Sequence, residues 1–180
     1  MAETKFTMAP ITSLLITGSM GSGKTTVLSE ASDILTAQNI PHASIDVDAL
    51  GTAHLPPPVQ NNQLMYRNLQ SVWENYARAG LTRLLLARAI EDRAELQLCR
   101  NAVSGAQIVI CRLTASIKTM QDRVQNRDIG TLQNIFIARV AELNSILDRV
   151  HLEDFSLSNE NRSVTDVAHE MLVRAGWLQE

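Results

Sequence analysis

The chain has 180 residues, of which 45% are hydrophobic and 19% charged, a composition typical of one globular domain with a sizeable core. Its formal net charge of -3 at pH 7 argues against a nucleic-acid partner, because a surface that binds nucleic acid must neutralise many phosphates. The first residues show no basic stretch ahead of an apolar segment, so we expect a cytoplasmic protein without a membrane partner.

Short apolar runs alternate with helical patterns along the chain, which predicts an α/β domain with helices on both faces of a parallel sheet. Residues 1–9 are a predicted flexible tail, and residues 10–180 a single domain. The predicted strands are residues 11–17, 42–47, 81–87, 107–113 and 155–158. The predicted helices are residues 23–39, 62–79, 91–103, 116–127, 131–152 and 164–175. Three consecutive prolines at 56–58 exclude regular structure, so residues 51–60 are a predicted loop.

The segment between the first predicted strand and the first predicted helix reads Gly-x-x-x-x-Gly-Lys-Thr. Its glycines permit the backbone angles at which several amide groups turn inward around a phosphate. Lys24 can reach the β and γ phosphates of a nucleoside triphosphate, and the Thr25 hydroxyl can ligate Mg²⁺. The predicted nucleotide-binding residues are Gly18, Ser19, Met20, Gly21, Ser22, Gly23, Lys24, Thr25 and Thr26. A chance glycine-rich turn is the alternative, which the position between strand and helix disfavours.

Two carboxylates, Asp46 and Asp48, stand at the end of the second predicted strand. Side chains alternate along a strand, so residues two apart point to the same face, and ligands of open parallel sheets bind at the carboxyl ends of the strands. One carboxylate can therefore orient Mg²⁺ beside Thr25, and the other can accept the proton of an attacking hydroxyl. We assign Asp46 to the metal and Asp48 to the acceptor. The alternative is a solvated pair at a strand end.

Arg123 and Arg127 are four residues apart on a predicted helix and so share one face. Two guanidinium groups side by side repel each other unless an anion lies between them, and a γ-phosphate or its transition state is such an anion. The alternative is that surface acids such as Asp122 pair with these arginines.

Other polar or aromatic residues are weaker candidates. Arg67 and Arg112 are interpreted as salt-bridge residues of the surface, and His54 as an incidental histidine of the proline-containing loop. Trp73 and Tyr76 lie at core spacing and are predicted to pack inside rather than stack on a base.

In their order along the chain, these motifs resemble those of the P-loop nucleoside and small-molecule kinases, a group with adenylate, shikimate and gluconate kinases and chloramphenicol phosphotransferase. Residues 18–26 resemble the phosphate loop, residues 46–48 the Asp-x-Asp after the second strand, and residues 122–127 the Arg-x-x-x-Arg that opens the lid. The resemblance is closest to bacterial predicted kinases of about this length.

The resemblance implies a three-layer P-loop NTPase fold whose five-stranded parallel sheet has the order 2-3-1-4-5. It implies ATP and Mg²⁺ as cofactors, an acceptor loop at about residues 49–66 and a lid region at about residues 123–135. It also implies that Arg123 lies against the adenine and Arg127 against the phosphates, and that residues 159–164 close over the adenine from the other side.

One departure from the family pattern concerns the third strand, where residues 84–88 read Leu-Leu-Leu-Ala-Arg without an acid at the tip. Asp46 is therefore the expected helper of the metal. The sequence predicts a phosphotransferase that uses Lys24, Asp46, Asp48, Arg123 and Arg127 on a small-molecule acceptor: a nucleoside or nucleotide, a sugar-like metabolite or an antibiotic. The alternative is a nucleotide-binding sensor or scaffold without phosphotransfer. A monomer or homodimer is expected.

Overall fold

The computed structural model describes residues 10–57, 59–127, 130 and 132–179, so the predicted tail at residues 1–9 lies outside the described residues. The strands are β1 (Thr12–Thr17), β2 (Ala43–Asp46), β3 (Arg83–Ala87), β4 (Gln107–Thr114) and β5 (Phe155–Ser158). The helices are α1 (Lys24–Ala37), the 3₁₀ helix η1 (Val47–Gly51), α2 (Asn61–Arg78), α3 (Arg93–Ala102), α4 (Ile117–Arg127), α5 (Gln133–Val150) and α6 (Val164–Arg174). No helix among the described residues has a stretch long and apolar enough to cross a bilayer.

The five strands form one parallel sheet in the order β2-β3-β1-β4-β5, which confirms the predicted fold class and strand order. β1 lies in the centre, where Leu15 pairs with Leu86 of β3 and with Ile110 of β4. Leu14, Leu15 and Ile16 are fully buried, because helices cover both faces of the sheet. Burial on both faces explains why the three inner strands β1, β3 and β4 contain continuous apolar runs, including the leucine-rich β3.

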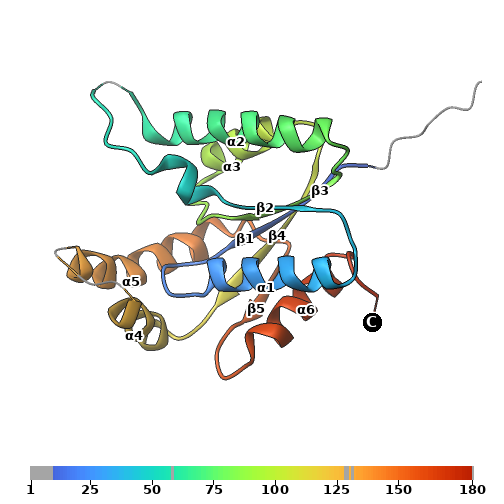
Figure 1. The fold of residues 1–180 in the computed structure, drawn as a ribbon. Helices are drawn as coiled ribbons and strands as arrows, with labels where there is room; N and C mark the ends of the chain where they lie inside the picture. Colours follow the sequence, from blue (N-terminus) through green and yellow to red (C-terminus); the bar gives the residue numbers. More distant parts are fainter. Residues whose placement is uncertain (1–9, 58, 128–129, 131, 180) are drawn as a thin grey trace, which may run out of the picture.

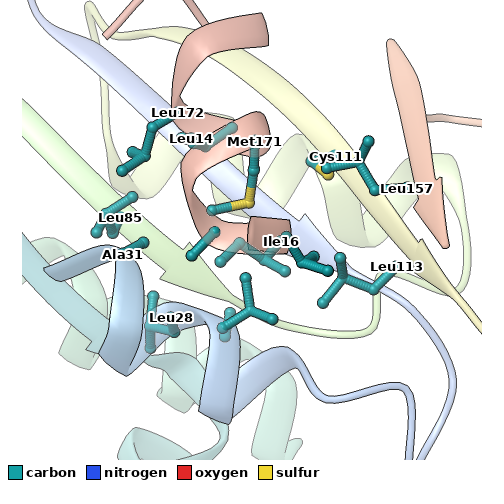
Figure 2. Packing of buried hydrophobic residues seen from close by; sticks show 14 of the residues in the cluster. Leu14, Ile16, Leu28, Ala31, Leu85, Cys111, Leu113, Leu157, Met171 and Leu172 are labelled. Atoms are coloured by element: carbon teal, nitrogen blue, oxygen red, sulfur yellow. The ribbon is translucent and has the colours of Figure 1, made fainter. Parts of the chain in front are cut away.

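Helices α1 and α6 cover one face of the sheet, and α2 and α3 cover the other (Figure 1). On the first face, Leu28 of α1 and Met171 of α6 pack with Ile16 of β1 (Figure 2). On the second face, Leu15 of β1 lies in one cluster with Trp73 of α2. This three-layer arrangement fixes the carboxyl ends of all five strands at one edge of the sheet, where the connecting loops meet.

The prediction that Tyr76 belongs to the core is wrong. Tyr76 is 42% exposed, whereas Trp73 is 3% exposed. The side of α2 that packs on the sheet includes Met65, Leu69, Trp73 and Ala77, at spacings of four residues. Position 76 falls beside this stripe and faces outward.

Helices α4 and α5 form a hairpin beside the loop that joins β1 to α1 (Figure 1). Met120 and Val124 of α4, Val140 of α5 and Met20 of that loop belong to one small apolar cluster. The Ser19 hydroxyl donates a buried hydrogen bond of 2.8 Å to the Val140 carbonyl. The hairpin that the sequence analysis placed next to a nucleotide is thus anchored directly to the predicted phosphate loop.

Candidate active site

The loop between β1 and α1 has the backbone geometry that the glycine motif predicts. Gly18, Gly21 and Gly23 all have positive φ angles, of 147°, 76° and 96°. A Cβ atom at Gly21 would lie 2.2 Å from the Met120 carbonyl oxygen, and one at Gly23 would lie 2.2 Å from the Asn159 side-chain nitrogen. Only glycine fits a loop held this closely between α4 and the segment after β5.

Lys24 is the first residue of α1, and its side chain folds back over the loop. Its Nζ donates hydrogen bonds to the carbonyl oxygens of Gly18, at 3.0 Å, and Ser19, at 3.2 Å. Burial lowers the pKa of Lys24 to about 8, although the charges of Asp48 and Asp46 act in the opposite direction. An anion placed beside this ammonium would offset the desolvation of its charge.

A hollow of about 200 Å³ opens beside this loop. It is lined by Gly21, Gly23, Lys24, Thr25, Thr26, Arg123 and Arg127. Its lining combines three cationic side chains with the first turn of a helix, and no acid is among the described lining residues. Such a surface suits the phosphates of a nucleotide. Both arginines that the spacing predicted to work together do meet at this hollow.

Arg123 links the phosphate loop to the segment after β5. Its Nη1 donates to the Gly21 carbonyl at 3.2 Å, and its Nη2 donates to the Asn159 carbonyl at 2.7 Å. Asn159 in turn donates from its side-chain nitrogen to the Ser22 carbonyl at 2.8 Å. Asn159, which the sequence analysis named only as the start of a loop, therefore fixes one wall of the site.

Glu160 holds the same segment against the start of α4. It accepts a hydrogen bond of 2.8 Å from the Ser116 hydroxyl and another from the Thr119 hydroxyl. These hydrogen bonds from Thr119 and Ser116 lower the pKa of the Glu160 carboxyl. The segment that the resemblance places over the adenine is thus fastened at both of its first two residues.

Asp46 ends β2 and reaches the first turn of α1, where its Oδ2 accepts a hydrogen bond of 2.7 Å from the Thr25 hydroxyl. Magnesium in phosphoryl-transfer sites is held by one or two protein oxygens together with phosphate oxygens and waters. A hydroxyl and a carboxylate in contact, at the rim of a phosphate-sized hollow, fit that donor set. Thr25 and Asp46 are the residues that would hold the ion.

Asp48 does not lie on a strand, so the argument from strand alternation is wrong for this residue. It belongs to η1, whose N-terminal cap is Asp46, and its backbone N–H donates to Asp46 Oδ1 at 3.2 Å. The short turn, rather than a shared strand face, keeps the two carboxylates together. The Asp48 carboxylate forms an ion pair with Arg88, the residue that follows β3.

Arg88 is itself held by a buried acid. Its Nε and Nη2 approach Glu95 Oε1 at 2.8 and 2.7 Å, and Glu95 is 6% exposed. Tyr66 also donates its hydroxyl to Glu95, at 3.1 Å. Burial by itself lowers the pKa of Arg88, but the negative charges of Glu95 and Asp48 outweigh it and raise the pKa. Asp48 is therefore oriented by a fixed cation at the carboxyl end of β3.

A second hollow, of about 520 Å³, lies beside this cluster. Its lining includes Gln60, Asn62 and Gln63 from the start of α2 and Arg88, Glu91 and Glu95 from the segment after β3. The acceptor surface was predicted around residues 49–66, so the six lining residues that follow β3 were missed. The available signal was a charged residue directly after a buried strand, at the edge of the sheet where ligands bind.

Several solved structures share this architecture. APS kinase from Mycobacterium tuberculosis, in complex with AMPPNP and APS, has a TM-score of 0.64 at 23% sequence identity, and the match covers 92% of this chain and 97% of that one. A sugar kinase from Janibacter sp. HTCC2649 has a TM-score of 0.62 at 16% identity, covering 91% and 94%. Shikimate kinase from Acinetobacter baumannii, in complex with shikimate, has a TM-score of 0.58 at 17% identity, covering 94% and 96%.

The chain has the P-loop kinase fold. The glycine loop, the parallel strand order and the agreement with these structures over nearly the whole chain all lead to this assignment. No protein-family model matches the chain, and no curated protein matches its sequence.

The weaker candidates lie outside the two hollows of this P-loop kinase fold or at their margins. Arg112 forms a salt bridge as predicted, from Nη2 to Asp148 at 2.6 Å, but its predicted place on the surface is wrong, because the residue is 4% exposed. His54 is exposed in the loop between η1 and α2, and Arg67 is exposed on α2. Residues 128, 129 and 131 of the predicted lid lie outside the described residues.

Proposed function

We propose that this chain is an ATP- and Mg²⁺-dependent phosphotransferase that moves the γ-phosphoryl group of ATP to a hydroxyl group of a small molecule. One observation carries the proposal: Asp48 interacts with a lining residue of each of the two hollows. Its charge acts on Lys24 of the phosphate hollow, and its ion pair with Arg88 ties it to the lining of the second hollow. A carboxylate at such a junction can meet both a γ-phosphate and an acceptor.

The roles of the residues follow from charge and position. The inward-facing loop amides and Lys24 hold the β and γ phosphates, and Arg123 and Arg127 balance the negative charge that spreads over the γ-phosphoryl oxygens. Asp48 accepts the acceptor's hydroxyl proton while the acceptor oxygen forms a bond to the γ-phosphorus. The bond from that phosphorus to the β–γ bridging oxygen breaks, and ADP leaves with the bond's electron pair. Thr25 and Asp46 would hold Mg²⁺, which would neutralise part of the negative charge of the phosphates.

The structural neighbours support the general class of this proposal. Those reported above include an APS kinase, a sugar kinase and a shikimate kinase, so the fold accommodates phosphotransfer to chemically different acceptors. A fold alone does not fix an activity, and the proposal therefore rests on the site of this chain.

The test is acceptor-dependent formation of ADP from ATP and Mg²⁺ with a panel of sugars, nucleosides and antibiotics. We expect turnover with at least one member and a decrease of about 10²- to 10⁴-fold in kcat for Asp48→Asn, because a general base is lost. Asp122→Asn is the matched control, since Asp122 is exposed and pairs with Lys118 on the outer side of α4. Nucleotide binding without any acceptor-dependent turnover would contradict the proposal and would favour the alternative, a nucleotide-binding sensor or scaffold without phosphotransfer.

A further inference from the structure

The charged side chains around the second hollow form hydrogen bonds or ion pairs with other groups of this chain. The charged side chains among its described lining residues are one arginine, Arg88, and three acids, Glu91, Asp92 and Glu95. The lining is therefore acidic before any acceptor enters, and this balance bears on the charge that an acceptor can carry.

Arg88 is not available to an anionic acceptor. Its Nε and Nη2 are both directed at Glu95, at 2.8 and 2.7 Å, and its Nη1 pairs with Asp48. Glu95 is in turn fixed by the Tyr66 hydroxyl at 3.1 Å and by the Glu91 backbone N–H at 3.2 Å. An acceptor carboxylate or phosphate would have to displace a carboxylate that is 6% exposed and would leave that charge buried without its partner.

A second arginine reaches the lining from α5 and is also paired. Arg139 Nη2 lies 2.5 Å from Glu91 Oε2, and its Nη1 lies 2.6 Å from Glu142 Oε1. Two carboxylates pair with the single positive charge of Arg139, so Arg139 does not make the hollow positive. Glu91 and Glu142 carry one more negative charge than Arg139 balances, and Asp92 adds another, so an incoming anion would meet an excess of negative charge.

The rest of the polar lining is uncharged. Gln60, Asn62 and Gln63 supply side-chain amides, each of which offers both donors and an acceptor. Groups that donate and accept at once suit hydroxyls, which do the same.

We propose that the acceptor is a hydroxyl-bearing small molecule without negative charge, and that this site excludes carboxylated, phosphorylated and sulfated acceptors. This inference rests on the proposed function, because it assigns the acceptor class of the same site. It separates the chain from two of the structural neighbours, whose structures were solved with the anions APS and shikimate.

The test measures binding of two acids and their uncharged counterparts: gluconate with glucitol, and shikimate with its methyl ester. Binding is followed by thermal shift and calorimetry, with and without saturating AMPPNP. We expect each acid to bind wild-type protein more weakly than its uncharged counterpart. Glu95→Gln, which removes the negative charge that faces Nε and Nη2 of Arg88, should raise the affinity for at least one acid by about tenfold.

Two further variants keep the test readable. Glu91→Gln removes one of the two carboxylates that pair with Arg139 and changes a side chain that is 37% exposed, so this variant should gain affinity for acids without the loss of a buried carboxylate. Glu74→Gln, on the outer side of α2, is the matched control and should change nothing. An acid that binds wild type as tightly as its counterpart overturns the inference, and so does the absence of any gain in both Glu95→Gln and Glu91→Gln.

The failure of this inference is distinguishable from failure of the proposed function. Loss of AMPPNP binding, or ATP turnover that no acceptor stimulates, concerns the phosphate hollow and contradicts phosphotransfer. The difference in affinity between acids and their uncharged counterparts is also measured without nucleotide, so it reports on the second hollow alone.

Discussion

Thr25 donates its hydroxyl hydrogen to Asp46 Oδ2 at 2.7 Å, which joins the first turn of α1 to the end of β2. The two residues are 21 positions apart, and their contact brings the only two predicted metal ligands to the rim of the phosphate hollow. This contact places a hydroxyl and a carboxylate, two oxygen donors of the kind that magnesium prefers, next to each other.

Substitution of Thr25 should therefore affect the magnesium-dependent part of nucleotide binding. For Thr25→Val we expect affinity for AMPPNP in Mg²⁺ to fall by about tenfold, because one hard oxygen ligand is lost, while affinity in EDTA stays close to wild type. Thr25→Ser, which keeps the hydroxyl, is the control. Calorimetric titrations in the two buffers measure the difference, and an equal loss in both would contradict the assignment of Thr25 to the metal.

Removal of Arg123 should weaken the nucleotide site by loosening two of its walls together. Arg123→Ala loses the hydrogen bonds to the Gly21 and Asn159 carbonyls, and it loses a positive charge beside the phosphates. We expect the Kd for AMPPNP to rise by about tenfold or more. Arg100→Ala, on the exposed side of α3, should leave the Kd unchanged. An unaltered Kd in Arg123→Ala would show that nucleotide binding does not depend on the Arg123 side chain.

The glycines offer a matched pair that separates steric contact from backbone strain. Gly21→Ala and Gly105→Ala both place a Cβ on a residue with positive φ, of 76° and 82°. At Gly21 the new atom meets the Met120 carbonyl at 2.2 Å, whereas at Gly105 nothing lies within 4 Å. We expect both variants to lose about 1 kcal/mol of unfolding free energy, and Gly21→Ala to lose about 1–3 kcal/mol more. Equal denaturation midpoints would mean that α4 does not pack against this loop.

Nucleotide affinity should depend on pH through Lys24. Burial lowers the pKa of its ammonium to about 8 in the free protein, against the charges of Asp48 and Asp46 and together with those of Arg127 and Arg88. Bound phosphate favours the charged form, so binding takes up a proton above about pH 8, and affinity should be constant below that pH and fall above it. The stability of the nucleotide-free protein should change with pH in the opposite direction to its nucleotide affinity. Its unfolded state binds more protons between pH 8 and 10.5, so its stability rises with pH there.

Calorimetric titrations of AMPPNP from pH 7 to 9.5 measure the first effect, and denaturation curves over the alkaline range measure the second. Lys24→Met, which has no charge to titrate, is the control for both. Affinity that is independent of pH in wild type would contradict a direct contact between Lys24 and the phosphates.

The phosphate loop and the parallel sheet were predictable because their signals are local, whereas the strand order followed only from the family resemblance. The spacing of Gly18, Gly23 and Lys24 lies within one turn between a strand and a helix, and the buried runs Leu14–Ile16 and Leu84–Leu86 mark central strands of a parallel sheet. Arg123 and Arg127 were predictable for a similar reason, since their spacing of four residues places them on one helical face.

The arrangement around Asp48 was not predictable from local spacing. It joins η1 to Arg88, 40 positions along the chain, and Arg88 to Glu95 in the next helix. The prediction that Asp46 and Asp48 lie close together is correct, but the argument from strand alternation is wrong, because a 3₁₀ helix begins between them. The contact of Asn159 with the phosphate loop was not predictable either, since only tertiary packing brings it to Ser22, 137 positions away.

The most direct test is a calorimetric titration of Mg²⁺–AMPPNP into wild type, Lys24→Met and the control Lys118→Met, whose lysine is exposed on the outer side of α4. If residues 18–25 hold the phosphates, wild type and Lys118→Met bind with a Kd between about 1 μM and 1 mM, and Lys24→Met binds at least about a hundredfold more weakly. Equal affinities of wild type and Lys24→Met, or no binding by wild type, would contradict the account.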